Sequence, residues 1–250
     1  MQLLLALGVG VLAGVCSGCF GIGGGLITTP LMRILLGVNE RIALGTPLTL
    51  VIPTAISGAY SYHRRGLIDY DTALIVGAVG MLFSILGALL TTRFSGRELM
   101  YFTSGMIVVS SLLVLGQSSG SAEGVKLPRP RILLTVLLGA LAGFLSGFLG
   151  IGGGFILVPL FIILLRMSAH GAIATSLVSI AIYSLQGSLV HYELGNVSLP
   201  LLLPVGIGSI LGAHAGSRLA LHLPEKHLKA SLGAFFLMCA AWLAWFEMTH

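Results

Sequence analysis

Long apolar segments, separated by short polar stretches, follow one another along the whole chain. A membrane-spanning helix needs about 20 mostly apolar residues, within a range of roughly 17–25. Most segments reach this length, but the second segment in each half of the chain is too short. In the first half the segments cover about 3–20, 26–37, 42–62, 70–91 and 99–116, and in the second half about 132–149, 155–165, 172–192, 199–221 and 228–246.

This pattern predicts an all-α polytopic membrane protein with about 8 spanning helices plus short half-helices. Hydrophobic residues make up 56% of the 250 residues, charged residues make up 8%, and the mean hydropathy is +1.03. A soluble domain has about 25% charged residues. The formal net charge is +5, which in a soluble protein could indicate nucleic-acid binding. Here the basic residues lie in short loops, so orientation in the membrane explains them better than nucleic acid does.

The second half of the chain repeats the first at an offset of 129 residues. Between Gly10 and Leu31, 14 of 22 positions are identical to those between Gly139 and Leu160. An internal duplication explains this match. It predicts a first transmembrane unit at residues 1–116, a polar linker at 117–131 and a second transmembrane unit at 132–250.

The basic residues predict how the two units are oriented. If each unit crosses the membrane an odd number of times, the units are inverted and the basic residues divide 9 against 4; an even number divides them 8 against 5. Because basic loops stay in the cytoplasm, inverted units are favoured, with both chain ends outside the cytoplasm. The nine residues expected on the cytoplasmic side are Arg64, Arg65, Lys126, Arg129, Arg131, Arg166, Arg218, Lys226 and Lys229, and the other four are Arg33, Arg41, Arg93 and Arg97.

Glycines recur every four residues in the first segment of each unit. Small residues at this spacing let membrane helices approach each other closely, so we interpret these two glycine ladders as packing surfaces. The ladders are Gly10, Gly14 and Gly18 in the first unit and Gly139, Gly143 and Gly147 in the second.

A denser glycine cluster, with the sequence GIGGG, follows each ladder at residues 21–25 and 150–154. Packing is one interpretation, and a break of the helix within the membrane is the other; such a break is tolerated where the backbone is buried in protein or lines a cavity. A half-helix would then begin near Pro30 or Pro159, because proline suits a first helical turn. Its start offers free N–H groups and a partial positive charge of roughly +0.5, which favour an anion. A P-loop is excluded because the required lysine is missing.

Polar residues recur at helical spacing on the third segment of each unit, so each set lies on one face of a helix. Hydrogen bonds between helices explain such stripes, and so does the lining of a substrate pathway; the sequence leaves both open. The stripes are Thr46, Thr49, Pro53 and Ser57 in the first unit and Thr175, Ser179, Tyr183 and Gln186 in the second.

Ionisable and reactive residues are few within the apolar segments. His214 and Arg218 lie one turn apart, and Arg218 is expected to extend to the cytoplasmic edge. Cys16 and Cys19 form a C-x-x-C, but their counterparts in the second unit are leucine and phenylalanine, which favours packing over redox or metal chemistry. No catalytic triad, carboxylate pair or metal-ligand set stands out, so an enzyme is not predicted. Residues at segment ends that could couple protons are His63, Asp69, Asp71, His191 and Glu193.

The chain resembles the TauE/SafE, or sulfite exporter, family of membrane permeases. The resemblance rests on the two GIGGG runs, the prolines that follow them, and the sequences ALGTPL and AIATSL, and it covers essentially the whole chain. It implies a carrier for small anions, often sulfite or organosulfonates such as sulfoacetate, in a prokaryotic inner membrane. One departure is Pro47, where the second unit has Ser176 and the family pattern usually has serine. The two units are therefore expected to contribute unequally.

The resulting hypothesis is a secondary transporter with alternating access around an anion site at the membrane midplane; a small-anion channel on the same fold is the alternative. The expected partners are a sulfonate or sulfite anion, membrane lipid, and protons or another coupling ion, without nucleic acid, metal or cofactor. No oligomeric state is predicted. The predicted substrate-binding residues are Gly23, Gly24, Gly25, Thr28, Thr29, Thr46, Thr49, Ser57, Gly152, Gly153, Gly154, Thr175, Ser176, Ser179 and Gln186.

Overall fold

The chain folds as a bundle of helices joined by short connections. The computed structural model describes residues 2–115 and 131–249, so residues 117–130 of the expected linker lie outside the described residues. Within these two ranges there is no strand. The helices are α1 (Gln2–Phe20), α2 (Gly25–Leu36), α3 (Glu40–His63), α4 (Tyr70–Leu90), the 3-10 helix η1 (Thr91–Arg93), α5 (Gly96–Leu115), α6 (Arg131–Leu149), α7 (Gly154–Leu164), α8 (Ala169–Glu193), α9 (Leu199–His222) and α10 (Glu225–Thr249).

Six helices in the described part of the chain are long and apolar enough to span a membrane, namely α1, α3, α4 with η1, α6, α8 and α9. They are the first, third and fourth segments expected in each half. The short second segments form α2, with 12 residues, and α7, with 11. The fifth segments form α5 and α10, with 20 and 25 residues, and a total of about 8 spans stays a prediction.

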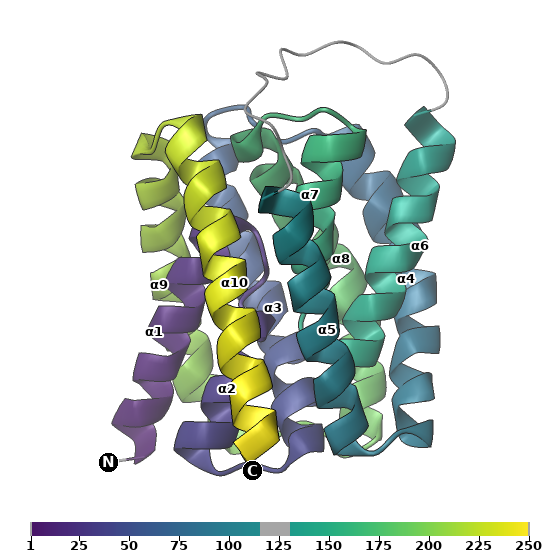
Figure 1. Cartoon of the computed structure of the whole chain (residues 1–250), viewed down its shortest axis with the longest axis vertical. Helices are drawn as coiled ribbons and strands as arrows, with labels where there is room; N and C mark the ends of the chain where they lie inside the picture. The colour runs from purple at the N-terminus through teal and green to yellow at the C-terminus, as the bar shows by residue number, and fades with distance from the viewer. Residues whose placement is uncertain (1, 116–130, 250) are drawn as a thin grey trace.

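The two halves of the chain enter the bundle from opposite ends (Figure 1). α1 begins and α10 ends at the lower end of the view, whereas α6 begins at the upper end. From α1 the chain returns through α2 to the lower end, and from α6 it returns through α7 to the upper end. Each first helix therefore forms a hairpin with the short helix that follows it, as two inverted units would require.

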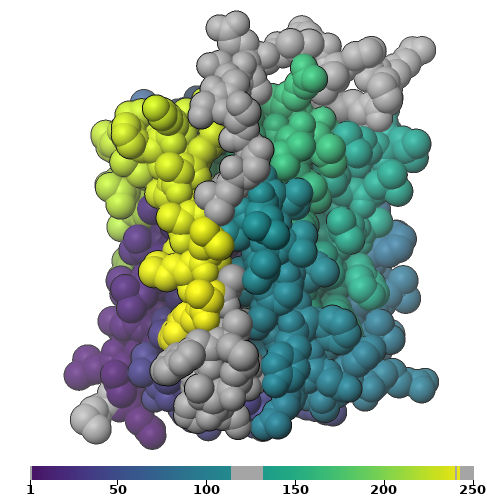
Figure 2. Space-filling model, in the orientation of Figure 1, coloured from purple at the N-terminus to yellow at the C-terminus, as the bar shows by residue number. Residues whose placement is uncertain are grey.

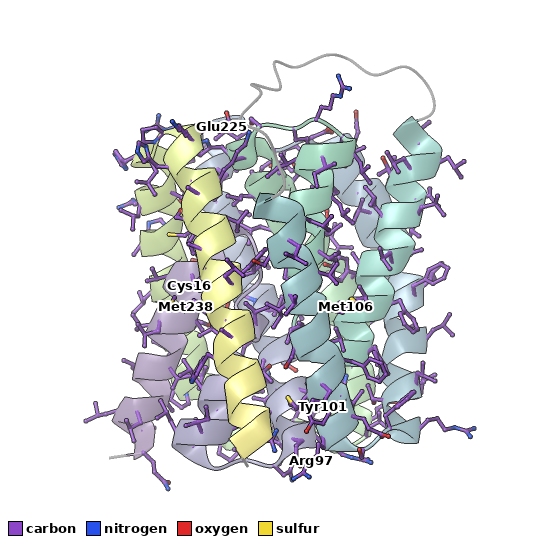
Figure 3. All side chains as sticks on the ribbon, viewed as in Figure 1. Cys16, Arg97, Tyr101, Met106, Glu225 and Met238 are labelled. Carbon is purple, nitrogen blue, oxygen red and sulfur yellow. The ribbon has the colours of Figure 1, made fainter. Side chains whose placement is uncertain are left out.

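The helix order separates the basic residues into two groups. Residues at the α3–α4, α7–α8 and α9–α10 connections lie at the upper end, and residues at the α2–α3 and α4–α5 connections lie at the lower end. Figure 3 labels Glu225 at the upper end and Arg97 at the lower end. Because the upper group is the larger one in the inverted arrangement, we expect the upper end to face the cytoplasm.

The glycine ladders join the first helix of each half to the fourth helix of the other half. A Cβ atom added to Gly14 of α1 would lie 2.2 Å from the carbonyl oxygen of Ser209 in α9. On α6, a Cβ atom added to Gly147 would lie 2.0 Å from the carbonyl oxygen of Ser84 in α4. Only glycine permits this approach, so the ladders have the packing role that the sequence predicts.

The fifth helices cover one face of the bundle, where α5 and α10 lie side by side (Figure 2). Phe235 of α10 stacks on Phe20 at the end of α1, with ring centroids 4.7 Å apart. Phe102 of α5 contacts Phe148 near the end of α6, with centroids 5.8 Å apart. Because Phe20 and Phe148 come just before the glycine clusters, these contacts hold the ends of both first helices.

A single added methyl group tests the ladder. We expect Gly14→Ala to lower the melting temperature in detergent, because overpacking against the α9 backbone costs roughly 1–3 kcal/mol. Gly8→Ala on the same helix is the matched control, since no atom lies within 4 Å of the added carbon. The control should melt at or slightly above the wild-type temperature, because alanine favours a helix more than glycine does. Equal melting temperatures for the two variants would contradict the packing role.

Cysteine labelling tests the orientation of the two units. Arg97 and Lys226 occupy equivalent positions at the offset of 129 and are both exposed. They lie in the first turns of α5 and α10, which begin at opposite ends of the bundle. In a background without the three native cysteines, we expect Lys226→Cys to react with a membrane-impermeant maleimide only from the cytoplasmic side and Arg97→Cys only from the other side. Reaction of both from one side would rule out inverted units.

Candidate functional site

Both glycine clusters interrupt the helix inside the bundle. Gly23 and Gly24 have φ values of 75° and 86°, and Gly152 and Gly153 have values of 89° and 65°. This left-handed region costs other residues roughly 1–2 kcal/mol each. The half-helices begin at once after these glycines, at the first residues of α2 and α7. The expected start near the prolines is therefore wrong by more than one turn, because the glycines themselves complete the break.

The two interrupted segments lie against each other in the buried interior. A Cβ atom added to Gly25, the first residue of α2, would lie 2.7 Å from the backbone of Ile151. One added to Gly154, the first residue of α7, would lie 2.4 Å from the carbonyl oxygen of Gly21. Each half-helix therefore starts against the other glycine cluster, and the positive ends of both helices point into one region.

The backbone N–H groups of these segments lack acceptors. The first amide bonds of the half-helices are those of Ile27, which donates to the Gly24 carbonyl at 3.1 Å, and of Ile156, which donates to the Gly153 carbonyl at 3.2 Å. Among the described residues, no acceptor forms a hydrogen bond with the amide N–H groups of residues 22–26 or 151–155, and all of these residues are buried. Buried amides without a partner are rare in proteins. Two runs of them indicate a site for a ligand that accepts hydrogen bonds.

Side chains from α3 and α8 donate to the carbonyl oxygens of the interrupted helices. These bonds fix the interrupted backbone and engage four of its carbonyl oxygens. They leave the amides of both breaks without an acceptor, and a ligand that accepts hydrogen bonds would satisfy them. The pairs are Tyr62 to Gly18 at 2.9 Å, Ser176 to Gly21 at 2.9 Å, Tyr183 to Gly152 at 2.7 Å and His191 to Gly147 at 2.9 Å.

Three buried hydroxyl groups near the clusters have no partner within the described part of the chain, those of Ser17, Thr29 and Ser146. The Cβ atom of Ser17 lies 3.5 Å from a Cβ atom built on Gly24, and that of Ser146 lies 3.3 Å from one built on Gly153. The two serines occupy equivalent positions in the sequence copies. This polar match within the repeated motif is the signal that could have identified them from the sequence.

The threonines at the start of the predicted stripes cap helices of the opposite half. The Thr46 hydroxyl accepts a hydrogen bond from the amide of Ser198 at 2.9 Å, and the Thr175 hydroxyl accepts one from the amide of Asp69 at 3.1 Å. Ser198 and Asp69 are the N-cap residues of α9 and α4. Thr46 and Thr175 therefore stabilise the contact between the two halves of the chain.

The other predicted side chains lie at different distances from the clusters. Ser176 contacts the first cluster through Gly21, and Thr28 donates to the Gly24 carbonyl at 2.9 Å. The remaining hydroxyls bond to neighbouring helices or to their own helix, and a direct role of these residues and of half-buried Gln186 in substrate binding stays a prediction. Those bonds join Thr49 to Ser188 at 2.7 Å, Ser57 to the Ile210 carbonyl at 2.8 Å and Ser179 to the Thr175 carbonyl at 3.0 Å.

The cysteines contribute to packing. Cys19 donates to the Gly216 carbonyl of α9 at 3.0 Å, and Cys16, Cys19 and Cys239 are free thiols. Within residues 2–115 and 131–249, no group of three or more metal-ligating side chains occurs. The helix contact of Cys19 agrees with the packing interpretation of the C-x-x-C sequence.

Known proteins resemble this chain along nearly its whole length. Residues 6–243 match the family described as sulfite exporter TauE/SafE. The chain belongs to the TauE/SafE family. A probable membrane transporter protein of Bacillus subtilis (strain 168), YdhB, is 32% identical over 225 residues, which cover 88% of this chain and 91% of the relative. A probable membrane transporter protein of Xylella fastidiosa (strain Temecula1) is 31% identical over 249 residues, 98% of this chain and 95% of the relative.

As a TauE/SafE protein with six candidate spans, the chain is a multi-pass membrane transporter. A relative in Methanocaldococcus jannaschii, also called a probable membrane transporter protein, is 24% identical over 240 residues. These names describe transporters, which fits the expectation that the chain is not an enzyme. No solved structure matches this TauE/SafE protein.

The capping role of the two threonines can be separated from substrate binding. We expect Thr46→Val and Thr175→Val to destabilise the TauE/SafE protein by roughly 0.5–1.5 kcal/mol, because each removes the acceptor of a part-buried helix-cap amide. Thr46→Ser and Thr175→Ser keep the hydroxyl and should melt near the wild-type temperature. Thermal unfolding in detergent measures this difference. If both valine variants were as stable as the wild type, the capping role of Thr46 and Thr175 would be wrong.

Proposed function

We propose that this TauE/SafE protein is a secondary transporter for a sulfur-containing oxyanion, such as sulfite or an organosulfonate like sulfoacetate, which binds between the two glycine clusters. One observation carries the proposal. The amides of residues 22–26 and 151–155 are buried at the starts of α2 and α7, and they form no hydrogen bond with an acceptor among the described residues. The family membership supports a transporter, and the excess of donors supports an anion.

Electrostatics favour a single anionic group at this position. Each helix start carries a partial charge of roughly +0.5, so two starts together offset about one negative charge. A sulfite or sulfonate group presents three oxygen atoms, each of which can accept several hydrogen bonds. Uncharged donors hold such a group without a strong ion pair, which favours release during transport.

The proposed site combines backbone and hydroxyl donors. The amides of Gly23–Gly25 and Gly152–Gly154 provide most of the contacts, and the unpartnered hydroxyls of Ser17, Ser146 and Thr29 complete them. The proposal therefore adds two serines to the residues predicted from the sequence. It assigns Thr46 and Thr175 to support of the site rather than to contact with the anion.

Two apolar side chains cover the site and suggest how access alternates. Val51 of α3 and Ile180 of α8 both lie against Gly23, at 2.9 and 3.1 Å from a Cβ atom built there, and Val51 also lies against Gly152 at 3.1 Å. Val51 and Ile180 are equivalent residues at the offset of 129. In the proposed cycle, residues 1–116 and 132–250 act as inverted units, and movement of α3 or α8 opens the site to one side of the membrane.

Removal of the unpartnered hydroxyls tests the site. We expect Ser17→Ala and Ser146→Ala each to weaken sulfite or sulfoacetate binding about three- to tenfold, since a hydrogen bond contributes roughly 0.5–1.5 kcal/mol. Their melting temperatures should equal or exceed that of the wild type, because a buried hydroxyl without a partner is removed. Calorimetric titration of the purified protein with sulfite, sulfoacetate, sulfate and acetate measures affinity and selectivity.

Ser104→Ala is the matched control, because its buried hydroxyl bonds to the Met100 carbonyl of its own helix α5. This control should bind every anion as the wild type does. Unchanged affinity in both Ser17→Ala and Ser146→Ala would refute the proposed site. In proteoliposomes, saturable exchange of sulfite distinguishes a carrier from an anion channel, which would conduct without saturation in the same range.

A further inference from the structure

A polar cavity of about 480 Å³ lies between the upper halves of α3 and α9. We call it the α3–α9 pocket. Three of its lining residues are arginines, two are histidines, and none is acidic. The residues are Tyr60, Ser61, Arg64 and Arg65 from α3 and its end, and His214, Arg218, Leu221 and His222 from α9.

The arginines of this pocket have no acidic partner. In the described residues, no carboxylate lies within the 4.0 Å of an ion pair from Arg64, Arg65 or Arg218. Like charges that share a cavity repel each other, and this repulsion is stronger near the membrane than in water. An anion in the pocket would offset it.

The walls of the pocket are fixed by hydrogen bonds between α3 and α9. Three hydroxyl-containing pairs join the two helices along their length, so a ligand would meet a site that is already formed. Preformed sites lose little entropy on binding. The pairs are Thr54 with Ser209, Ser57 with the Ile210 carbonyl and Ser61 with Ser217, each at 2.8 Å.

An exposed apolar strip continues from the pocket toward the middle of the bundle. On α3, Ile56 lies two turns below Arg64 and is 59% exposed; on α9, Leu211 lies two turns below Arg218 and is 62% exposed. Two turns of helix measure about 11 Å. The surface thus places cationic groups at the membrane edge and apolar groups below them, as a phospholipid places its phosphate and its acyl chains. A soluble anion would use only the cationic part.

We propose that the α3–α9 pocket binds the phosphate of an anionic phospholipid, with one acyl chain along Ile56 and Leu211. Basic pockets between membrane helices on the cytoplasmic side are suited to such head groups. The upper end of the bundle, where the pocket lies, is the end expected in the cytoplasm. This lipid site is separate from the glycine clusters and does not depend on the proposed transport function.

Lipid binding to the full-length purified protein tests the proposal. Native mass spectrometry with added phosphatidylglycerol should show a tightly bound lipid, and phosphatidylcholine should bind more weakly. We expect the double variant Arg64→Gln/Arg218→Gln to bind phosphatidylglycerol roughly 25-fold more weakly, from about fivefold for each arginine near the membrane surface. The matched control is Arg41→Gln/Arg93→Gln, which removes the same charge from exposed arginines at the lower end.

Two further measurements distinguish binding of a lipid from binding of a free anion. Leu211→Gln should weaken phosphatidylglycerol binding, and millimolar inorganic phosphate should not displace the lipid. If Leu211→Gln has no effect and phosphate displaces the lipid readily, the pocket binds free oxyanions and the proposal is wrong.

Arg64→Lys/Arg218→Lys keeps the charge and should restore most of the affinity, which excludes misfolding as the cause. Wild-type affinity of the glutamine variant would also overturn the proposal, whereas Ser17→Ala should leave lipid binding unchanged.

Discussion

Backbone amides inside a membrane must find hydrogen-bond acceptors, and the centre of this structure depends on how that requirement is met. The breaks after α1 and α6 leave two runs of amides at residues 22–26 and 151–155 without helical partners. Tyr62, Ser176, Tyr183 and His191 donate to carbonyl groups at or next to the breaks, and within the described residues none of them accepts a hydrogen bond from these amides. The lack of acceptors for these amides is therefore built into the fold, and the proposed anion site rests on it.

The surrounding helices keep the two breaks at one position. α1 and α6 are held along their length by glycine ladders that contact α9 and α4 through backbone atoms. Phe235 and Phe102 hold their ends, and Thr46 and Thr175 fix the starts of the partner helices. Glycine thus has two physical roles within a few residues: it allows close packing in the ladder, and it allows left-handed backbone in the cluster.

The sequence predicted the elements better than their contacts. Apolar length identified the helices, and glycine density identified the breaks, because both effects are local. The role of Thr46 and Thr175 could not be predicted, because helical spacing shows that polar residues share a face but not which neighbouring helix starts opposite them. Ser17 and Ser146 were visible as a polar match between the copies, yet only the structure shows that their hydroxyls lack partners. The pocket around Arg218 requires α3 and α9 to be adjacent, which no local pattern reveals.

The crossed packing of the first helices has a mechanical consequence. A ladder with backbone atoms in contact leaves no free volume for sliding, so α1 moves together with α9, and α6 moves together with α4. Each of these pairs takes one helix from either half of the chain. In the proposed transport cycle these packed pairs would move as units, and such units do not correspond to the two halves of the sequence. The sequence match at an offset of 129 residues runs along the chain, whereas the closest helix packing in the structure joins one half of the chain to the other.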